Sequence, residues 1–211
     1  MSYKRREIQP DFPIHITARC NNREHFPNSL DYTWDLFSDY FTFIHHNFGI
    51  KFHSLVLMPN HFHSIVRDPQ MKLSEGMNYF MRETSKIMGR DSKRMNKIWG
   101  GPFHSSTIAS PHYYLHGYKY VYRNPTQAML GSPLNWKFST LPQLLGQHRG
   151  IIPLEYDATL FEDVEGTLAW LNQQPKAEHY EAVKNALKKR DFTLRKDRKT
   201  QKDHVLEFDL L

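Results

Sequence analysis

Hydrophobic side chains recur with two different periods over the first 90 residues of the chain. They alternate with polar residues over residues 12–18, a period of two that predicts a half-buried strand. They recur every three or four positions over residues 28–48 and 73–88, which predicts two amphipathic helices that end at Gly49 and Gly89. This part of the chain therefore alternates between strand and helix.

A β-hairpin is predicted between the two helices. Residues 50–57 and 61–67 both have strand-like hydrophobic patterns, and the turn residues 59–60 lie between them. Because side chains alternate between the two faces of a strand, His61 and His63 lie on the same face. A sheet has little structural use for two neighbouring imidazoles, so this pair is the first candidate for chemistry.

A fourth strand and a third helix follow. Residues 103–109 are predicted to form the strand. Ser110 and Pro111 begin a tyrosine-rich helix over residues 112–124, which Pro125 ends or kinks. The predicted order is βαββαβ with an additional helix, which is the plan of a ferredoxin-like α+β fold with a four-stranded antiparallel sheet. In that plan two helices cover one face of the sheet, and we expect the other face to be free to bind a nucleic-acid strand.

The composition changes near residue 145. We predict one domain over residues 1–145 and a helical, basic C-terminal extension over residues 146–211. Apolar spacing predicts helices near residues 161–171 and 182–187. The basic run over residues 188–203 is either a solvated end or an arm that contacts phosphate groups.

Composition and charge narrow the class of protein. Of the 211 residues, 39% are hydrophobic and 14% are aromatic, which predicts a folded chain with a sizeable core. No apolar run approaches the ~20 residues of a membrane span, and no secretory signal is recognisable. Cys20 is the single cysteine and has no partner for an internal disulfide, so we expect a cytoplasmic protein. The net charge of +6 favours an anionic partner such as nucleic acid.

The tyrosine-rich helix offers residues that could complete a metal site with the histidine pair. Two imidazoles on one strand face can converge on a metal ion, although a site needs a third ligand and paired structural histidines are the alternative. Tyr120 and Asn124 are four positions apart and share one face of the predicted helix, with His116 one turn earlier on that face. If this face meets the histidine pair, the helix brings a phenol and an amide oxygen to the same ion.

Five segments of the sequence resemble, in order, the motifs of a known family of nucleases. The segment with His61 and His63 resembles the histidine–hydrophobic–histidine signature of the HUH single-strand DNA nucleases. The whole set resembles the single-tyrosine transposases, in particular the REP-associated tyrosine transposases of the IS200-like family. The resemblance covers about residues 10–145 and not the C-terminal extension. The matching segments are HITAR (15–19), MPNHFH (58–63), WGGPFHSS (99–106), YVYRNP (120–125) and WKFST (136–140).

The resemblance implies a metal-dependent single-stranded DNA endonuclease and strand transferase that cuts next to DNA hairpins through a covalent 5′-phosphotyrosine intermediate. By motif match, Tyr120 is the catalytic nucleophile, and Tyr122 is the alternative. His61, His63 and Asn124 are metal ligands, with Asn124 in the place of the family's glutamine. The family also implies a divalent cofactor, Mg²⁺ or Mn²⁺, a hairpin-forming single-stranded DNA partner and a homodimer.

Further basic and aromatic residues near these motifs are candidates for DNA contact. Basic side chains bind phosphates and aromatic side chains stack on bases, with core packing as the alternative for the aromatic ones. We interpret His15, His53, His104 and His116 as structural, although the first two lie on central strands where they would line the open face of the sheet. The candidates for DNA contact are Arg19, Arg67, Trp99, Phe103, Lys119 and Arg123.

Two other functions stay open on the residues alone. A non-catalytic nucleic-acid-binding module on the same fold would use the same charge and aromatic residues, and Tyr120 would then have no role. A small metallohydrolase with water as the nucleophile would need a carboxylate near the histidine pair, where Asp68 and Glu83 are the nearby candidates. Only the transposase reading predicts a covalent link between the protein and DNA.

Overall fold

The computed structural model describes residues 12–93, 96–147, 150–197 and 200–211. The first eleven residues of the predicted domain and residues 198–199 of the basic run lie outside this described part. Four strands form one antiparallel sheet in the order β2-β3-β1-β4, so the predicted ferredoxin-like sheet is confirmed. The strands are β1 Ile14–Arg19, β2 Lys51–Met58, β3 His61–Arg67 and β4 His104–Thr107.

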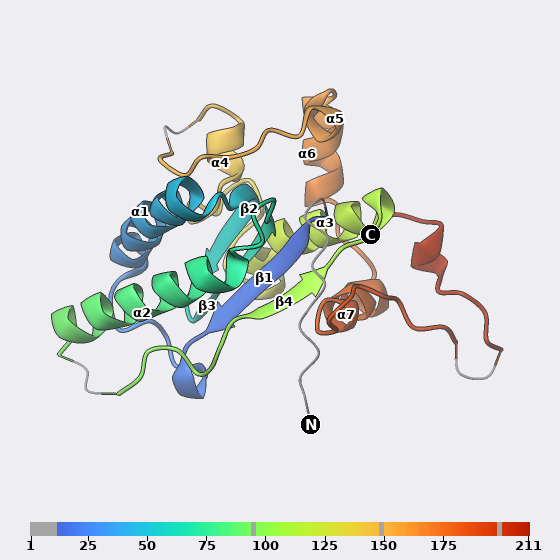
Figure 1. Cartoon of the computed structure of the whole chain (residues 1–211). Coiled ribbons are helices and arrows are strands. Elements are labelled where there is room, and N and C mark those ends of the chain that lie inside the picture. The colour runs from blue at the N-terminus through green and yellow to red at the C-terminus, as the bar shows by residue number, and fades with distance from the viewer. Residues whose placement is uncertain (1–11, 94–95, 148–149, 198–199) are drawn as a thin grey trace.

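Helices α1 (Leu30–Phe48) and α2 (Leu73–Asp91) cover one face of the sheet, as predicted (Figure 1). Ser29 caps the start of α1, and Gly49 ends it with a left-handed backbone (φ 68°) that glycine adopts without strain. The predicted end of α2 at Gly89 is wrong by two residues. The helix continues because glycine is tolerated inside a helix, and the hydroxyl of Ser92 donates to the carbonyl oxygen of Met88 at 2.6 Å.

The core under α1 and α2 is dominated by aromatic rings that pack edge to face or stacked. Phe41 and Phe80 stack at 4.4 Å between ring centroids, and Phe37 meets Phe80 at 4.9 Å. Phe62 and Trp99 complete this cluster and are buried. Such contacts anchor the two helices to the sheet and fix the position of β3, which carries the histidine pair.

The other face of the sheet is not free, which corrects our expectation of an open nucleic-acid platform. Helix α3 (Pro111–Gln127) packs across it, against Val56 and Ile65 of β2 and β3. Pro125 neither ends nor breaks this helix. The carbonyl oxygen of Val121, which would have accepted from the missing N–H of Pro125, receives the side-chain amide of Asn124 at 3.4 Å.

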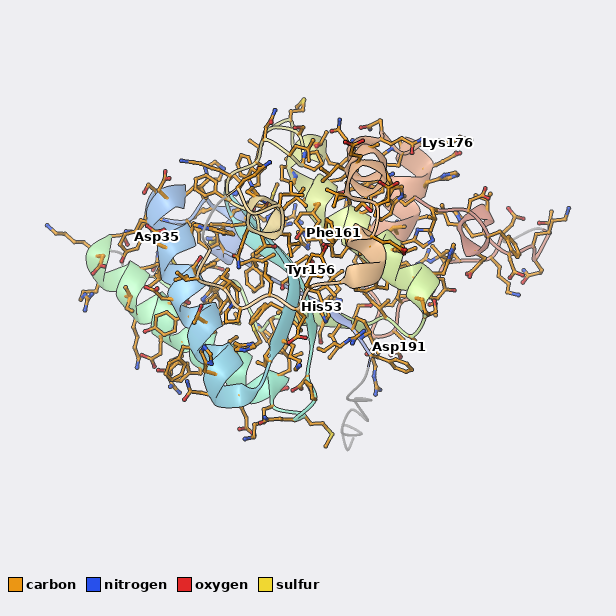
Figure 2. The ribbon with its side chains drawn as sticks, turned by 90° about the horizontal axis from the view of Figure 1, so that it is seen from above. Asp35, His53, Tyr156, Phe161, Lys176 and Asp191 are labelled. Carbon is orange, nitrogen blue, oxygen red and sulfur yellow. The ribbon has the colours of Figure 1, made fainter. Side chains whose placement is uncertain are left out.

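The C-terminal extension packs on α3, which thereby lies between the extension and the sheet (Figure 1). The ring of Tyr118 on α3 packs against Phe161 of the extension. The ring of Phe161 also lies 5.7 Å from that of Tyr156, and Figure 2 shows Phe161 and Tyr156 near the centre of the molecule. The two segments share a hydrophobic core. The predicted domain boundary near residue 145 stays a prediction. The helices after α3 are α4 Leu141–Leu144, α5 Ala158–Phe161, α6 Val164–Asn172 and α7 Ala177–Ala186, with short 3₁₀ turns at Asn21–Arg23 and Val205–Glu207.

Irregular segments pair with both edge strands of the sheet. On the β4 side, the N–H of Thr107 donates to the carbonyl oxygen of Arg190, and the N–H of Phe192 donates to that of Thr107, both at 2.8 Å. On the β2 side, the N–H of Leu57 donates to the carbonyl oxygen of Phe138 at 2.9 Å. Part of the predicted basic run is therefore a docked element with Phe192 buried, and not a free arm.

No helix in the described part of the chain is long and apolar enough to cross a membrane.

Candidate active site

The histidine pair lies at the start of β3 and faces α3. Ile65, two positions further on, belongs to the core on the α3 side, whereas Phe62 belongs to the core under α1 and α2. The period-two prediction for this strand is therefore confirmed. The rings of His61 and His63 lie 4.9 Å apart and nearly perpendicular.

A hydrogen bond fixes the tautomer of His61. Its Nδ1 lies 2.6 Å from the side-chain oxygen of Asn60, whose amide nitrogen donates to the carbonyl oxygen of Arg23 at 2.7 Å. Because the carboxamide oxygen only accepts, Nδ1 of His61 carries the hydrogen and Nε2 keeps its lone pair. This is how metal-binding histidines are commonly oriented by a second group.

His15 contacts the ring of His63, although sequence reasoning had favoured a structural role for His15. Nε2 of His15 lies 2.9 Å from Nδ1 of His63, and the two rings stack at 5.1 Å. His15 pairs directly with Ile65 in the β1–β3 register, so its ring reaches His63 diagonally. When Nδ1 of His63 carries the hydrogen and donates it to His15, Nε2 of His63 keeps its lone pair for a ligand.

Burial keeps these three imidazoles neutral. Loss of water lowers the pKa of His61 to about 3, with a smaller contribution from Arg19. Burial also lowers the pKa of His15 to about 3 and takes the pKa of His63 well below its usual value. Neutral imidazole is the form that ligates a metal ion.

Helix α3 brings Tyr120 and Asn124 to the histidine pair. The ring of Tyr120 lies 5.5 Å from that of His63 and nearly perpendicular to it. Both helix residues line a cavity of about 580 Å³ together with His61 and His63. The amide nitrogen of Asn124 donates to the backbone carbonyl oxygen of Tyr120 at 2.8 Å, which leaves the oxygen end of the carboxamide for a ligand.

Tyr122 is on the other side of α3. Its hydroxyl is 2.9 Å from Oγ1 of Thr140, and its ring packs on Tyr118 at 5.0 Å. It is fully buried and does not line the cavity. The geometry therefore favours Tyr120 over Tyr122 as the tyrosine that acts with the histidines.

The phenol of Tyr120 is largely enclosed, with 5% of its surface exposed. Burial raises the pKa of Tyr120 to about 12, with a further contribution from Glu181, whereas Arg19 and the side chains of Asn124 and Tyr180 act in the opposite direction. A phenol in this state is a poor nucleophile at neutral pH without a group that favours the phenolate.

The residues present fit a divalent ion. Among the described residues, no group of three or more His, Cys, Asp or Glu side chains is arranged to hold one, so a third ligand has to be of another type. The carboxamide of Asn124 is such a group in the same cavity as His61 and His63. Two imidazoles and an amide oxygen are compatible with Mn²⁺ or Mg²⁺.

The predicted cationic DNA contacts fall into two groups. Arg19 is exposed at the cavity, and Arg67 is exposed at the far end of β3, by a different pocket. Lys119 and Arg123 are fully buried, contrary to our expectation of a DNA-facing position. Lys119 donates to the carbonyl oxygen of Leu211 at 2.6 Å, and Arg123 donates to that of Asn172 at 2.6 Å, so both anchor the C-terminal extension.

The two predicted aromatic contacts pack in the core. Trp99 is buried, and its indole N–H donates to the carbonyl oxygen of Met81 at 3.1 Å. Phe103 is half-buried against the same core. Core packing, the alternative that the sequence left open, therefore describes Trp99, whereas the contact of Phe103 with DNA stays a prediction.

The remaining histidines differ in position. His104 lines the cavity, and its Nε2 is 3.0 Å from the carbonyl oxygen of Leu187. His53 lies at a bulge in β2, beside Tyr114. Figure 2 labels His53. His116 lies one turn before Tyr120 on α3, as predicted, but it does not line the cavity, because its Nε2 lies 2.8 Å from the carbonyl oxygen of Leu206 in the C-terminal segment.

One wall of the cavity comes from α7, which sequence reasoning did not assign to the site. Tyr180 and Lys184 of α7 line it, together with Lys188 just after the helix. Apolar spacing had predicted a helix here, and Lys188 begins the basic run. The docking of that helix on α3 is a long-range contact that has no local signal in the sequence.

Comparison with known proteins gives one match to a family model. The model described as "Transposase IS200 like" matches residues 9–118, which is more than half of the chain and ends two residues before Tyr120. A comparison with curated protein sequences finds no significant match.

Comparison with solved structures gives one match that shares the fold and one weaker match. A REP-associated tyrosine transposase bound to a REP hairpin has a TM-score of 0.55 and 21% identity, over 74% of this chain and 93% of its own. A crystal structure from Deinococcus radiodurans R1, described as a candidate transposase, has a TM-score of 0.39 and 13% identity, over 71% of this chain and 100% of its own.

Proposed function

We propose, since this chain belongs to the family of IS200-like transposases, that it cleaves and rejoins single-stranded DNA with Tyr120 as the nucleophile and His61, His63 and Asn124 as ligands of a divalent ion. The observation that carries the proposal is the placement of Tyr120, whose ring lies 5.5 Å from that of His63 in one cavity. All these residues come from a single chain, so the site needs no second copy to assemble.

The cleavage step follows from this arrangement. The oxygen of Tyr120 attacks a backbone phosphorus, a phosphorus–oxygen bond to tyrosine forms, and the bond to the 3′-oxygen breaks, so that the departing strand end takes up the proton as a 3′-hydroxyl. A bound Mg²⁺ or Mn²⁺ would neutralise a nonbridging phosphate oxygen and the charge that develops there. Asn60 and His15 keep the two histidine rings in the orientation that ligation requires.

The reverse step rejoins DNA. Because the phosphotyrosine bond keeps the energy of the broken phosphodiester, a 3′-hydroxyl can attack the phosphorus and release Tyr120 without ATP. The enclosed position of Tyr120 and His63 limits attack by water, which would end the reaction as hydrolysis.

The DNA partner is inferred from charge and from fold. Arg19, Lys184 and Lys188 surround the cavity and supply positive charge for a phosphate backbone. The fold is shared with a transposase that binds a REP hairpin, which supports a hairpin-containing single strand as the substrate. A homodimer stays a proposal from the family resemblance.

A covalent adduct tests the proposal. The protein is incubated with labelled hairpin-containing single strands and Mn²⁺, and protein–DNA adducts are separated under denaturing conditions. We expect an adduct that Tyr120→Phe abolishes and that Tyr122→Phe, the matched control two positions along the same helix, retains. His61→Ala is expected to abolish cleavage while DNA binding persists.

The other outcomes identify the alternatives. Cleavage without an adduct would indicate a metallohydrolase, and binding without cleavage would indicate a non-catalytic module. An adduct that disappears only in Tyr122→Phe would show that the nucleophile was assigned to the wrong tyrosine.

A further inference from the structure

Tyr180 of the C-terminal extension lies directly against Tyr120. The two rings are stacked at 5.0 Å between centroids with 29° between their planes. Tyr180 lines the same cavity as His61 and His63 and has 5% of its surface exposed. Its hydroxyl is buried and makes no hydrogen bond of regular geometry among the described residues, but it lies close enough to the hydroxyl of Tyr120 to influence the pKa of Tyr120.

The position of Tyr180 is held from several sides. On α7, Val183 and Ala186 are buried against α3. Just after the helix, the carbonyl oxygen of Leu187 lies 3.0 Å from Nε2 of His104. Ahead of α7, Arg123 donates to the carbonyl oxygen of Asn172 at 2.6 Å. The stack on Tyr120 is therefore part of a rigid wall and not a chance contact of a mobile side chain.

Packing alone explains the ring of Tyr180 but not its hydroxyl. Phenylalanine would fill the same space without burying a polar group, and a buried hydroxyl without a partner is unfavourable. Unsatisfied groups of this kind in a native structure are often explained by a functional role. Tyr180 stacks on Tyr120 in the same cavity, where the oxygen of Tyr120 would gain negative charge during cleavage.

We propose that Tyr180 is a positioning residue for Tyr120: its ring holds the phenol of Tyr120 against the histidine wall, and its hydroxyl donates a hydrogen bond to the oxygen of Tyr120 when that oxygen is negatively charged. This inference rests on the proposed function. It adds a residue from the C-terminal extension, beyond the part of the chain that matches the family model.

The proposed hydrogen bond would act in both cleavage and rejoining, because the oxygen of Tyr120 carries negative charge in each. In cleavage, the oxygen of Tyr120 gains anionic character as it approaches the phosphorus. In rejoining, the 3′-hydroxyl attacks the phosphorus and gives up its proton to water, the bond to Tyr120 breaks, and Tyr120 leaves as a phenolate that then takes a proton back from water. Tyr180 keeps its own proton throughout, because burial raises its pKa well above the usual value.

The charged groups around the pair do not replace this donor. Glu181 is next to Tyr180 on α7 and opposes a negative charge on Tyr120. Arg19 of β1 favours such a charge on Tyr120, and Arg123 of α3 favours one on Tyr180. Arg19 is exposed and Arg123 is committed to backbone carbonyl oxygens, so a buried neutral donor has a distinct role.

Single-turnover kinetics test the proposal. Tyr180→Phe keeps the stacked ring and removes only the hydroxyl, whereas Tyr180→Leu removes both. We expect Tyr180→Phe to slow cleavage and rejoining by about tenfold to a hundredfold, the range for one hydrogen bond to a charged oxygen. Tyr114→Phe, which removes another buried hydroxyl from α3 outside this cavity, is expected to leave both rates unchanged.

A second readout does not depend on activity. The ionisation of Tyr120 is followed by ultraviolet absorbance as the difference between each protein and its Tyr120→Phe counterpart. We expect Tyr120 to ionise at a higher pH in the Tyr180→Phe background, because the donor to its phenolate is gone.

The outcomes separate the two proposals. Wild-type rates and an unchanged Tyr120 titration in Tyr180→Phe would overturn the role of Tyr180 and leave the transposase mechanism standing. If the wild-type protein formed no adduct, the proposed function would fail. The titration would then still decide whether the hydroxyl of Tyr180 acts on the oxygen of Tyr120.

Discussion

Acidification is expected to destabilise this protein through His116, which holds the C-terminal segment to α3. Its Nδ1 accepts the backbone N–H of Leu211 at 3.2 Å, so Nε2 carries the hydrogen and donates to the carbonyl oxygen of Leu206 at 2.8 Å. The imidazole is fully buried and uses both nitrogens only in its neutral form. Protonation would turn Nδ1 into a donor that faces another donor.

The size of the effect follows from the pKa. Burial lowers the pKa of His116 to about 4 against the opposing hydrogen bond to Leu206, with smaller effects of His112, His204 and His179. Because the folded-state value lies below the unfolded-state value of about 6.5, the stabilisation is complete above pH 6.5 and is lost as the pH falls towards 4. Linkage gives a loss of about 2 kcal/mol at pH 5 from this one residue.

Urea unfolding at pH 7.5 and pH 5 measures this loss. The wild-type protein will lose additional stability through other buried histidines, so the test is the difference from His116→Gln, which does not titrate. We expect the variant to lose about 2 kcal/mol less than the wild type between the two pH values. His25→Gln, at an exposed position, serves as the control. Equal losses in wild type and His116→Gln would refute the reasoning.

Two further predictions concern the cavity. His15→Phe removes the partner of Nδ1 of His63 and is expected to weaken Mn²⁺ binding by about tenfold to a hundredfold in calorimetry, the usual effect of losing an outer-shell partner; unchanged affinity would show that His15 does not orient His63. The double variant Arg19→Ala/Lys188→Ala should weaken the binding of single-stranded DNA. The slope of log affinity against log salt concentration should fall in magnitude by about 1.4, at ~0.7 per lost phosphate contact. The control Arg67→Ala, at the other end of β3, should leave this slope unchanged.

Local patterns predicted the strands and the first two helices well, because alternation and helical spacing are properties of neighbouring residues. The shared face of His61 and His63 followed from the same rule. The contact between His15 and His63 did not, since it depends on the register between two strands far apart in the sequence. Resemblance to a family, and not spacing, singled out Tyr120 among the tyrosines of α3.

What the sequence could not supply was the partner of each amphipathic surface. Lys119 and Arg123 were expected to contact DNA because they are basic and lie close to the motifs, yet the C-terminal extension covers both. The covered sheet face and the contribution of Tyr180 have the same origin. Each depends on how a helix docks across the chain, and hydrophobic periodicity predicts that a helix has a buried face without predicting what that face meets.

The pairing of both sheet edges has a consequence for self-association. Strands at the edge of a sheet usually offer unpaired backbone groups to other molecules and are a common origin of aggregation. Here β4 is bonded to the segment around Arg190 and β2 to the segment around Phe138. These contacts are expected to hinder two copies from joining strand to strand. Shortening the chain before Arg190 is expected to uncover β4 and to favour oligomerisation by sheet extension.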